Sequence, residues 1–252
     1  MSKWIGTCTW GEVPHLSEEA QRDLLASTPP YMRKAVSEGL PIFGTGLIYP
    51  IPEEDIRSPV VIPKADWERG FGMDVGWGRT AAGWFCRDPQ SQVIYLHDYH
   101  YQGQELPVLH VEAIKARGAW IPGVIDPRAD ARSPIDGKQL LKMYREYGLH
   151  IEQADNAVAT GIRRVWEMLT KGLLKICENI APFWKEFRIY HADAEGRPVK
   201  EHDHMMDLVR YFVMSGIERM KTEAGCTRMV ESHEEALLGR RGWSRRTSWM
   251  AG

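Results

Sequence analysis

The sequence predicts an α/β fold built on a mixed β-sheet with helices packed on it. Three strand-like segments, 71–76, 81–87 and 93–100, follow one another across short turns, which is typical of an antiparallel meander. From residue 106 onward, short apolar segments alternate with amphipathic helical patterns, which indicates parallel strands joined by helices. The 252 residues are 43% hydrophobic and 26% charged, as expected for a globular protein with a sizeable core.

The N-terminal segment, residues 1–66, is dense in proline and contains one clear helical pattern. Ser17 is a good N-cap for that helix, which is expected to end near Ala26, and a second short helix is expected at 31–37. Residues 50–63 have the composition of an extended connector that lies against something larger. We interpret 1–66 as a linker, or as the remnant of a neighbouring domain.

The main domain is expected to span residues 67–220. In its third strand, alternation predicts that Val93, Tyr95, His97 and Tyr99 share one face. Asn156 is expected to cap a long amphipathic helix, and Asp203 to begin a last helix that ends near Met220. The remaining expected elements are helices at 106–117, 137–147 and 180–188, and strands at 123–126, 149–153 and 173–177. Residues 221–252 form a basic tail that we expect to be flexible.

Composition excludes several classes of protein. The net charge of −2 does not by itself indicate a nucleic-acid partner. No segment approaches the ~18 apolar residues of a membrane span, and the N-terminus lacks the layout of a secretory signal. The four cysteines are isolated from one another, so reduced thiols are expected. These features predict a cytosolic protein.

Acidic residues occupy positions where α/β sheets place function. Asp74 lies inside an apolar strand, Asp126 ends a buried strand, and Asp203 and Asp207 share one face of the last helix with His204 beside them. Buried carboxylates brought together repel one another, and a divalent cation removes that repulsion. Oxygen ligands select Mg²⁺ or Mn²⁺, and two such ions can hydrolyse a phosphodiester.

Each acid also has a structural interpretation. Asp126 precedes a proline and is compatible with a turn, and Asp203 is compatible with an ordinary N-cap. Asp74 has no local capping role. Basic residues after Asp126, namely Arg128, Arg132 and Lys138, could neutralise DNA phosphates or belong to a solvated loop.

Five motifs in order resemble the nuclease domain of the large terminase subunit of tailed bacteriophages. They are 72–77 (GMDVGW), 124–127 (VIDP), 154–156 (ADN), 172–176 (GLLKI) and 201–211 (EHDHMMDLVRY). The resemblance covers about 67–220 and implies an RNase H-like fold. It also implies an endonuclease that cuts concatemeric double-stranded DNA by two-metal hydrolysis during viral genome packaging.

The same resemblance implies roles for particular residues and partners. Asp74, Asp126, Asp203 and Asp207 would be catalytic, and these four with His204 would bind two Mg²⁺ or Mn²⁺ ions. The partners would be a terminase small subunit and a portal, in the cytoplasm of the bacterial host. A large terminase also has an ATPase domain with a Gly-x-x-x-x-Gly-Lys-Ser/Thr loop, and that motif does not occur here. DNA cleavage without ATP-driven translocation is therefore expected.

Three alternatives stay open at the level of sequence. Residues 74–80 fit the Asp-x-Gly-x-x-x-Thr phosphate hairpin of actin-like kinases, although no second hairpin follows residue 150. A non-catalytic module of a packaging motor is the second alternative. RNase H-like resolvases or integrases are the third, and only the motif at 201–211 separates them from a terminase.

Overall fold

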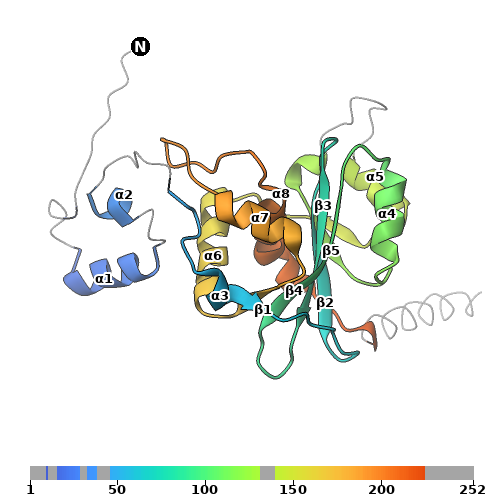
Figure 1. The fold of residues 1–252 in the computed structure, drawn as a ribbon, viewed down its shortest axis with the longest axis horizontal. Coiled ribbons are helices and arrows are strands. Elements are labelled where there is room, and N and C mark those ends of the chain that lie inside the picture. The colour runs from blue at the N-terminus through green and yellow to red at the C-terminus, as the bar shows by residue number, and fades with distance from the viewer. Residues whose placement is uncertain (1–9, 11–15, 29–32, 39–45, 131–139, 225–252) are drawn as a thin grey trace, which may run out of the picture.

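A seven-stranded mixed sheet forms the centre of the computed structural model, which describes residues 10, 16–28, 33–38, 46–130 and 140–224 (Figure 1). The strand order is β1-β7-β4-β3-β2-β5-β6. Strands β2, β3 and β4 form the expected antiparallel meander, β5 and β6 extend it in parallel from β2, and β7 and β1 extend it in parallel from β4. The strands are β1 (Arg57–Ser58), β2 (Glu68–Asp74), β3 (Thr80–Arg87), β4 (Ile94–Gln102), β5 (Gly123–Ile125), β6 (Ile151–Gln153) and β7 (Leu174–Cys177).

Helices cover both faces of the sheet and create two hydrophobic cores (Figure 1). On one face lie α6 (Val158–Thr170), α7 (Ala181–Ile189) and α8 (His204–Tyr211). On the other lie α4 (Pro107–Lys115) and α5 (Leu140–Glu146). The chain continues from α8 through a π-helical turn, Phe212–Gly216, and a 3-10 turn, Ile217–Arg219. The three-layer α/β architecture expected from the sequence is therefore present.

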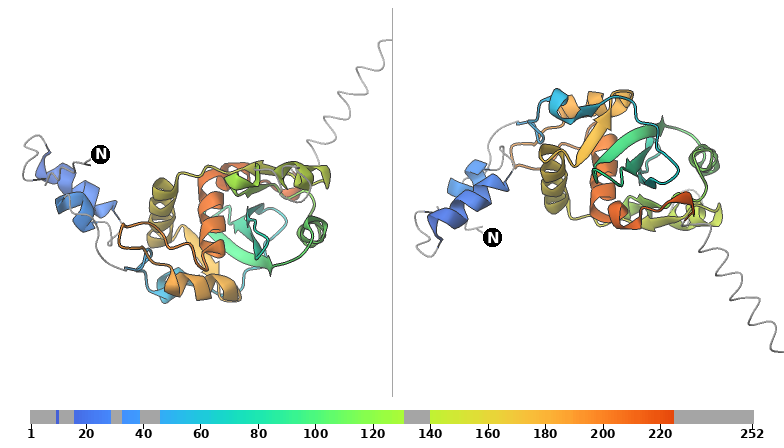
Figure 2. Two further views of the ribbon diagram at one scale, coloured as in Figure 1. Left: turned by 90° about the horizontal axis from the view of Figure 1, so that it is seen from above. Right: turned by 90° about the horizontal axis from the view of Figure 1, so that it is seen from below.

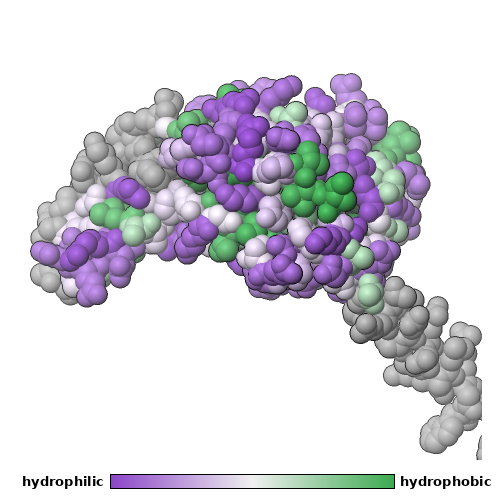
Figure 3. All heavy atoms as spheres, turned by 60° about the horizontal axis from the view of Figure 1, so that its bottom comes forward, coloured by the Kyte–Doolittle hydropathy of each residue, from purple (hydrophilic) through white to green (hydrophobic). Residues whose placement is uncertain are grey.

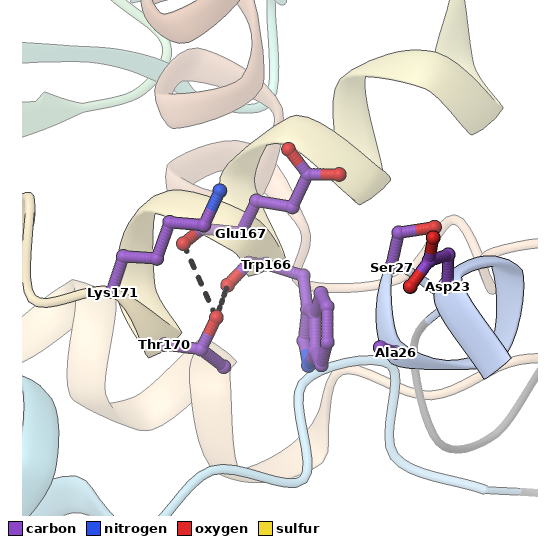
Figure 4. A pocket seen from close by; sticks show the side chains of 7 residues that line it. All are labelled: Asp23, Ala26, Ser27, Trp166, Glu167, Thr170 and Lys171. Carbon is purple, nitrogen blue, oxygen red and sulfur yellow. Dashed lines mark hydrogen bonds between the residues drawn. The ribbon is translucent and has the colours of Figure 1, made fainter. Parts of the chain in front are cut away.

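Two short helices, α1 (Glu18–Ala26) and α2 (Arg33–Glu38), lie beyond α6 and away from the sheet (Figures 1 and 2). Ser17 caps α1 as expected, since its Oγ accepts a hydrogen bond of 3.2 Å from the backbone N–H of Ala20. A cavity of about 290 Å³ separates α1 from α6, where Trp166 faces residues of α1 (Figure 4). None of the residues of α1 is buried, so this helix is not part of either hydrophobic core.

Part of the segment expected to be a linker contributes to the sheet and the core. Ile48 and Ile56 are fully buried, and Ile56 ends α3 (Glu53–Ile56). Arg57 and Ser58 then pair with Ile176 and Cys177 as the parallel edge strand β1. A two-residue strand carries no hydrophobic periodicity, so the sequence alone does not reveal it. The three-part division of the chain stays a prediction.

A β-bulge changes the expected pattern of side chains in β4. Trp84 pairs with Asp98 but the next residue, Phe85, pairs with Leu96, so His97 is an extra residue in β4. The bulge shifts the alternation, and the prediction that residues 93, 95, 97 and 99 share one face is wrong. Tyr99 instead pairs with Gly83 and lies on the same face of the sheet as Leu96.

The start of α6 also differs from the expectation. The N-cap is Ala157 rather than Asn156, and it makes no capping hydrogen bond through its side chain. Asp155 Oδ1 accepts a hydrogen bond of 2.9 Å from the backbone N–H of Ala157, and the N–H of Asp155 donates to Ser215 Oγ. An Asx-type turn that is tied to a distant serine therefore replaces the local cap.

The surface carries its exposed apolar side chains in small groups. Figure 3 shows patches of hydrophobic surface separated by hydrophilic residues on the face that it presents. Val60 and Ile62, in the segment that joins β1 to β2, are among the most exposed of the large apolar residues. In the described part of the chain, no helix has both the length and the apolar character that a membrane crossing requires.

Helix α8 packs directly on the backbone of β2. A Cβ atom at Gly72 would lie 2.7 Å from the carbonyl oxygen of Leu208, and one at Gly83 would lie 2.8 Å from the Leu208 side chain. Next to this contact the rings of Phe85 and Phe212 stack with their centroids 3.7 Å apart. The absence of side chains at these glycines therefore sets how close α8 comes to the end of β2.

We expect Gly72→Ala to lower the free energy of unfolding by about 1–3 kcal/mol, because the new methyl group would overlap the Leu208 carbonyl. Gly78→Ala is the matched control, since a Cβ atom there would meet nothing within 4 Å. Urea unfolding followed by circular dichroism measures both variants. Equal stability of the two variants would contradict the close packing of α8 on β2.

Candidate active site

Three separate elements bring acidic side chains to one end of the sheet. Strands β2 and β5 are parallel, with Met73 paired to Ile125, so Asp74 and Asp126 leave the sheet side by side. The first turn of α8 lies against β2 at the same end and carries Asp207. All four acids predicted as catalytic are buried: Asp74 is 5% exposed, Asp126 2%, Asp203 7% and Asp207 2%.

Asp74 has one oxygen paired and one oxygen free. Its Oδ2 accepts a hydrogen bond of 2.8 Å from Nδ1 of His204, whereas Oδ1 is buried and has no hydrogen-bond partner. Burial raises the pKa of Asp74 despite the hydrogen bond from His204, and the nearby charges of Asp207 and Asp126 raise it further. The hydrogen bond to Asp74 in turn raises the pKa of His204.

Asp126 is held by groups on both sides of it. Its Oδ1 accepts hydrogen bonds from the backbone N–H of Arg128 at 2.9 Å and from the Tyr211 hydroxyl at 3.2 Å. The guanidinium of Arg128 lies 3.1 Å from Oδ2 and is largely exposed to solvent. The basic residue after Asp126 therefore borders the acidic site, while Arg132 and Lys138 lie outside the residues that the structure describes.

Lys200 joins the two acids at the start of α8. Its Nζ lies 2.9 Å from Oδ2 of Asp203 and 2.8 Å from Oδ2 of Asp207. Arg210 donates a hydrogen bond of 2.9 Å to the other oxygen of Asp207. Burial acts to raise the pKa of Asp207, but the charges of Arg210 and Lys200 outweigh it and lower the pKa. Asp203 and Asp207 therefore face the same side, as their spacing predicts.

The cap of α8 is a residue that the sequence does not indicate. Asp203 is the N-cap residue but makes no capping hydrogen bond through its side chain. Buried Glu186 of α7 replaces it, because its carboxylate accepts hydrogen bonds from the backbone N–H of Met205 at 2.6 Å and from the Tyr101 hydroxyl at 2.7 Å. Glu186 is 19 residues from Met205, so no local capping pattern reveals it.

The β2–β3 turn adds a further basic group, Arg79, near the site. The guanidinium of Arg79 lies over the ring of Tyr101, 4.8 Å from its centroid, and the same ring lies edge-on to His204 at 6.2 Å. Arg79 thus reaches Asp74 through two side-chain contacts, Tyr101 and His204. Trp77, in the same turn, is exposed. Neither residue is among the sequence-predicted DNA contacts.

The carboxylate oxygens of these four acids are ligands that suit a hard divalent cation, although each carboxylate contacts a basic side chain in this structure. Among the residues that the structure describes, no three His, Cys, Asp or Glu side chains form a group that could hold one ion. Lys200 lies between Asp203 and Asp207, and the guanidinium of Arg128 lies against Asp126. The unpaired, buried Oδ1 of Asp74 is the atom that most needs a cation. The predicted ligand roles stay predictions.

This combination of a mixed sheet and acids at the ends of β2 and β5 and on α8 is that of an RNase H-like domain. Residues 71–215 match the Terminase RNaseH-like domain family, and the chain belongs to that family. It is 28% identical over 231 residues to the large terminase subunit of Salmonella phage P22, a match that covers 87% of this chain and 46% of the relative. The chain thus spans about half the length of the curated relatives it matches.

Solved structures show the same fold. The P22 large terminase nuclease domain superposes with a TM-score of 0.64 at 26% identity, over 73% of this chain and 98% of that one. The large terminase of a thermophilic bacteriophage gives a TM-score of 0.65 at 21% identity, over 82% of this chain and 55% of that one. The large terminase nuclease of phage G20c, whose structure has bound magnesium, gives 0.50 at 13% identity, over 67% and 96%.

The buried cap makes stability depend on pH in a defined direction. Burial raises the pKa of Glu186 to about 7 from 4.5, against the hydrogen bonds from Tyr101 and Met205. Between these values the unfolded chain loses the proton while the folded chain keeps it, so folding stability falls as pH rises from about 4.5 to 7.

We expect Glu186→Gln to remove this dependence, since the amide keeps a carbonyl that can accept from Met205 and does not titrate. The wild type should lose on the order of 2 kcal/mol relative to Glu186→Gln across this interval. Glu186→Ala should be less stable than Glu186→Gln at every pH, because the cap is lost. Thermal melts at several pH values measure this, and parallel pH profiles of wild type and Glu186→Gln would contradict the buried cap.

Proposed function

We propose that this chain is the nuclease domain of a viral genome-packaging terminase and hydrolyses phosphodiester bonds of double-stranded DNA with two divalent ions. The observation that carries the proposal is the convergence of Asp74, Asp126 and Asp207 from three elements on one buried place, with one Asp74 oxygen unpaired. The similarity to the P22 nuclease domain supports the reaction. The bound magnesium in the G20c nuclease supports the choice of cofactor.

In this proposal Asp74, Asp126, Asp203, His204 and Asp207 hold two Mg²⁺ or Mn²⁺ ions. When bound, such a pair of ions would activate a water molecule and stabilise the leaving oxygen of the phosphodiester. Asp74, Asp126, Asp203 and Asp207 are the catalytic residues.

Neighbouring residues orient these ligands. The Tyr211 hydroxyl fixes Asp126, and Arg210, three residues further along α8, fixes Asp207. Glu186 caps the first turn of α8, and so sets the position of His204 and Asp207 at the end of β2. Each of these three groups is buried, which excludes water from the side of the site that faces the core.

Substrate phosphates are held by basic groups around the acids. Arg128 is exposed beside Asp126, and Arg79 is stacked on Tyr101 with no carboxylate partner among the described residues. Both could neutralise phosphates on either side of the scissile bond. Arg132 and Lys138 stay predicted contacts of the same kind.

The packaging context extends the proposal. The substrate would be concatemeric viral DNA in the bacterial cytoplasm, and the partners an ATPase domain, a small terminase subunit and a portal. Within the chain, residues 1–66 would link to the ATPase domain, 67–220 would form the nuclease and 221–252 a basic tail. Residues 225–252 lie outside the described part of the chain.

The alternatives each have an observable consequence. In an actin-like kinase, the turn after Asp74 would bind ATP phosphates, but membership of the terminase family favours the nuclease. A non-catalytic module would keep the fold and bind neither metal nor DNA productively. A resolvase or integrase would require branched or end-specific DNA rather than ordinary duplex.

We expect the protein to nick and then degrade supercoiled plasmid in the presence of Mn²⁺, and chelation to stop the reaction. Asp74→Ala should lower the rate by at least about 100-fold. Changing a residue that only hydrogen-bonds to a metal ligand already costs about 10–100-fold, and losing a ligand itself should cost more. Asp88→Ala is the matched control, because Asp88 is only partly buried and lies in the turn at the opposite end of β3. Full activity of Asp74→Ala, or turnover of ATP, would contradict the site.

We expect Arg79→Gln to raise KM for duplex DNA more than it lowers kcat, because Arg79 would contact a flanking phosphate. The slope of log affinity against log salt should also fall by about one. Arg87→Gln is the control, since Arg87 pairs with Glu68 at the end of β3 that lies away from Arg79. An unchanged salt slope would exclude a phosphate contact by Arg79.

A further inference from the structure

A lysine of the chain occupies a position between two buried carboxylates. Nζ of Lys200 lies 2.9 Å from Asp203 and 2.8 Å from Asp207, whose side chains are only 10% and 4% exposed. The side chain of Lys200 itself is 52% exposed. The charge of a half-exposed lysine side chain thus neutralises two buried acids.

The acids of the site differ in how fully their oxygens are paired. Both oxygens of Asp207 are engaged, Oδ1 by Arg210 and Oδ2 by Lys200. Asp74 keeps Oδ1 buried and without a hydrogen bond, although its other oxygen is paired with His204. A cation can therefore reach the free oxygen of Asp74 without displacing a basic group from that carboxylate, whereas an ion between Asp203 and Asp207 must displace Lys200.

Of the two basic groups on Asp207, only Lys200 can leave easily. The side chain of Arg210 is 1% exposed and packs so closely on Gly161 that a Cβ atom there would lie 2.6 Å from Arg210 Cγ. Lys200 lies in the segment between α7 and α8, next to His202, whose φ of 52° is uncommon for a residue with a side chain. Of the basic groups that contact Asp207, the exchangeable one is therefore Lys200.

We propose that Lys200 is a built-in competitor for the divalent cation at the position between Asp203 and Asp207. The site then fills in two steps. The first ion binds beside Asp74 and Asp126, and the second binds only in molecules from which Lys200 has withdrawn. The inference rests on the proposed metal-dependent function and adds to it the residue that sets the concentration of Mg²⁺ or Mn²⁺ at which the second ion binds.

Competition by a tethered group lowers apparent affinity without blocking the site. The apparent dissociation constant of the second ion rises as the fraction of molecules from which Lys200 has withdrawn becomes smaller. Since a short tether gives an effective concentration in the millimolar range or above, the effect is expected to be large. The first ion should be affected little.

The test counts bound Mn²⁺ directly, by the electron paramagnetic resonance signal of free Mn²⁺ during titration of the full chain without DNA. The wild type should bind one ion more tightly than the second. In Lys200→Met the second ion should bind at least about tenfold more tightly. This is the change expected when the ion no longer has to break one charge-assisted hydrogen bond of Lys200. Lys200→Gln should behave in the same way, and provides a second neutral variant if Lys200→Met does not fold.

Two controls separate competition from net charge. Lys171→Met removes the same charge at an exposed position at the end of α6 and should leave both affinities unchanged. Lys200→Arg keeps a cation that can bridge the two acids, so the second ion should remain weakly bound. Circular dichroism confirms that each variant is folded.

The outcomes distinguish this inference from the proposed function. If both proteins bind two ions and each ion binds the wild type and Lys200→Met equally well, the competition by Lys200 is overturned while the metal-dependent function stands. Weaker binding in Lys200→Met would overturn it too, since Lys200 would then support the ion. If neither protein binds Mn²⁺, the metal-dependent function falls and the inference falls with it.

Discussion

The burial of several carboxylates at one end of the sheet is the constraint around which this molecule is organised. Asp74, Asp126 and Asp207 come from β2, from the residue after β5 and from α8, and the charges of Asp126 and Asp207 raise the cost of ionising Asp74. Arg128, His204, Lys200 and Arg210 neutralise them in this structure. The site thus combines fixed acids with basic groups, of which the exposed ones, Arg128 and Lys200, can exchange and the buried Arg210 cannot.

The rigidity of the acids follows from how α8 is held. Glycines on β2 and β3 let the helix approach the sheet backbone, the stacked Phe85 and Phe212 fix the turn that follows it, and Glu186 caps its first turn from α7. All of these contacts are buried or made to backbone. The basic residues that face solvent, Arg79, Arg128 and Lys200, are those that can exchange partners when DNA or metal arrives.

Membership of the Terminase RNaseH-like family agrees with the proposed cleavage of DNA, and the chain's own contacts add the detail around the acids. The acids expected from the sequence lie at the ends of two parallel strands and on the last α-helix. How Lys200, Glu186 and Arg79 are placed around those acids belongs to this chain. If Lys200 competes with the second ion, the protein combines a metal-dependent centre with its own threshold for activation.

The sequence by itself determined the meander, the parallel extension after it, the cap of α1 and the acids that meet at the site, because these depend on short-range periodicity, turn chemistry and ordered motifs. Only the tertiary structure decided the bulge at His97, the edge strand at Arg57–Ser58 and the Glu186 cap. It also decided that Lys200 bridges two acids. The edge strand, the bulge and the cap are contacts between residues distant along the chain, and the Lys200 bridge depends on the path of a loop without regular periodicity. In each case the stability of the feature depends on packing and burial in the folded chain, which no local sequence pattern encodes.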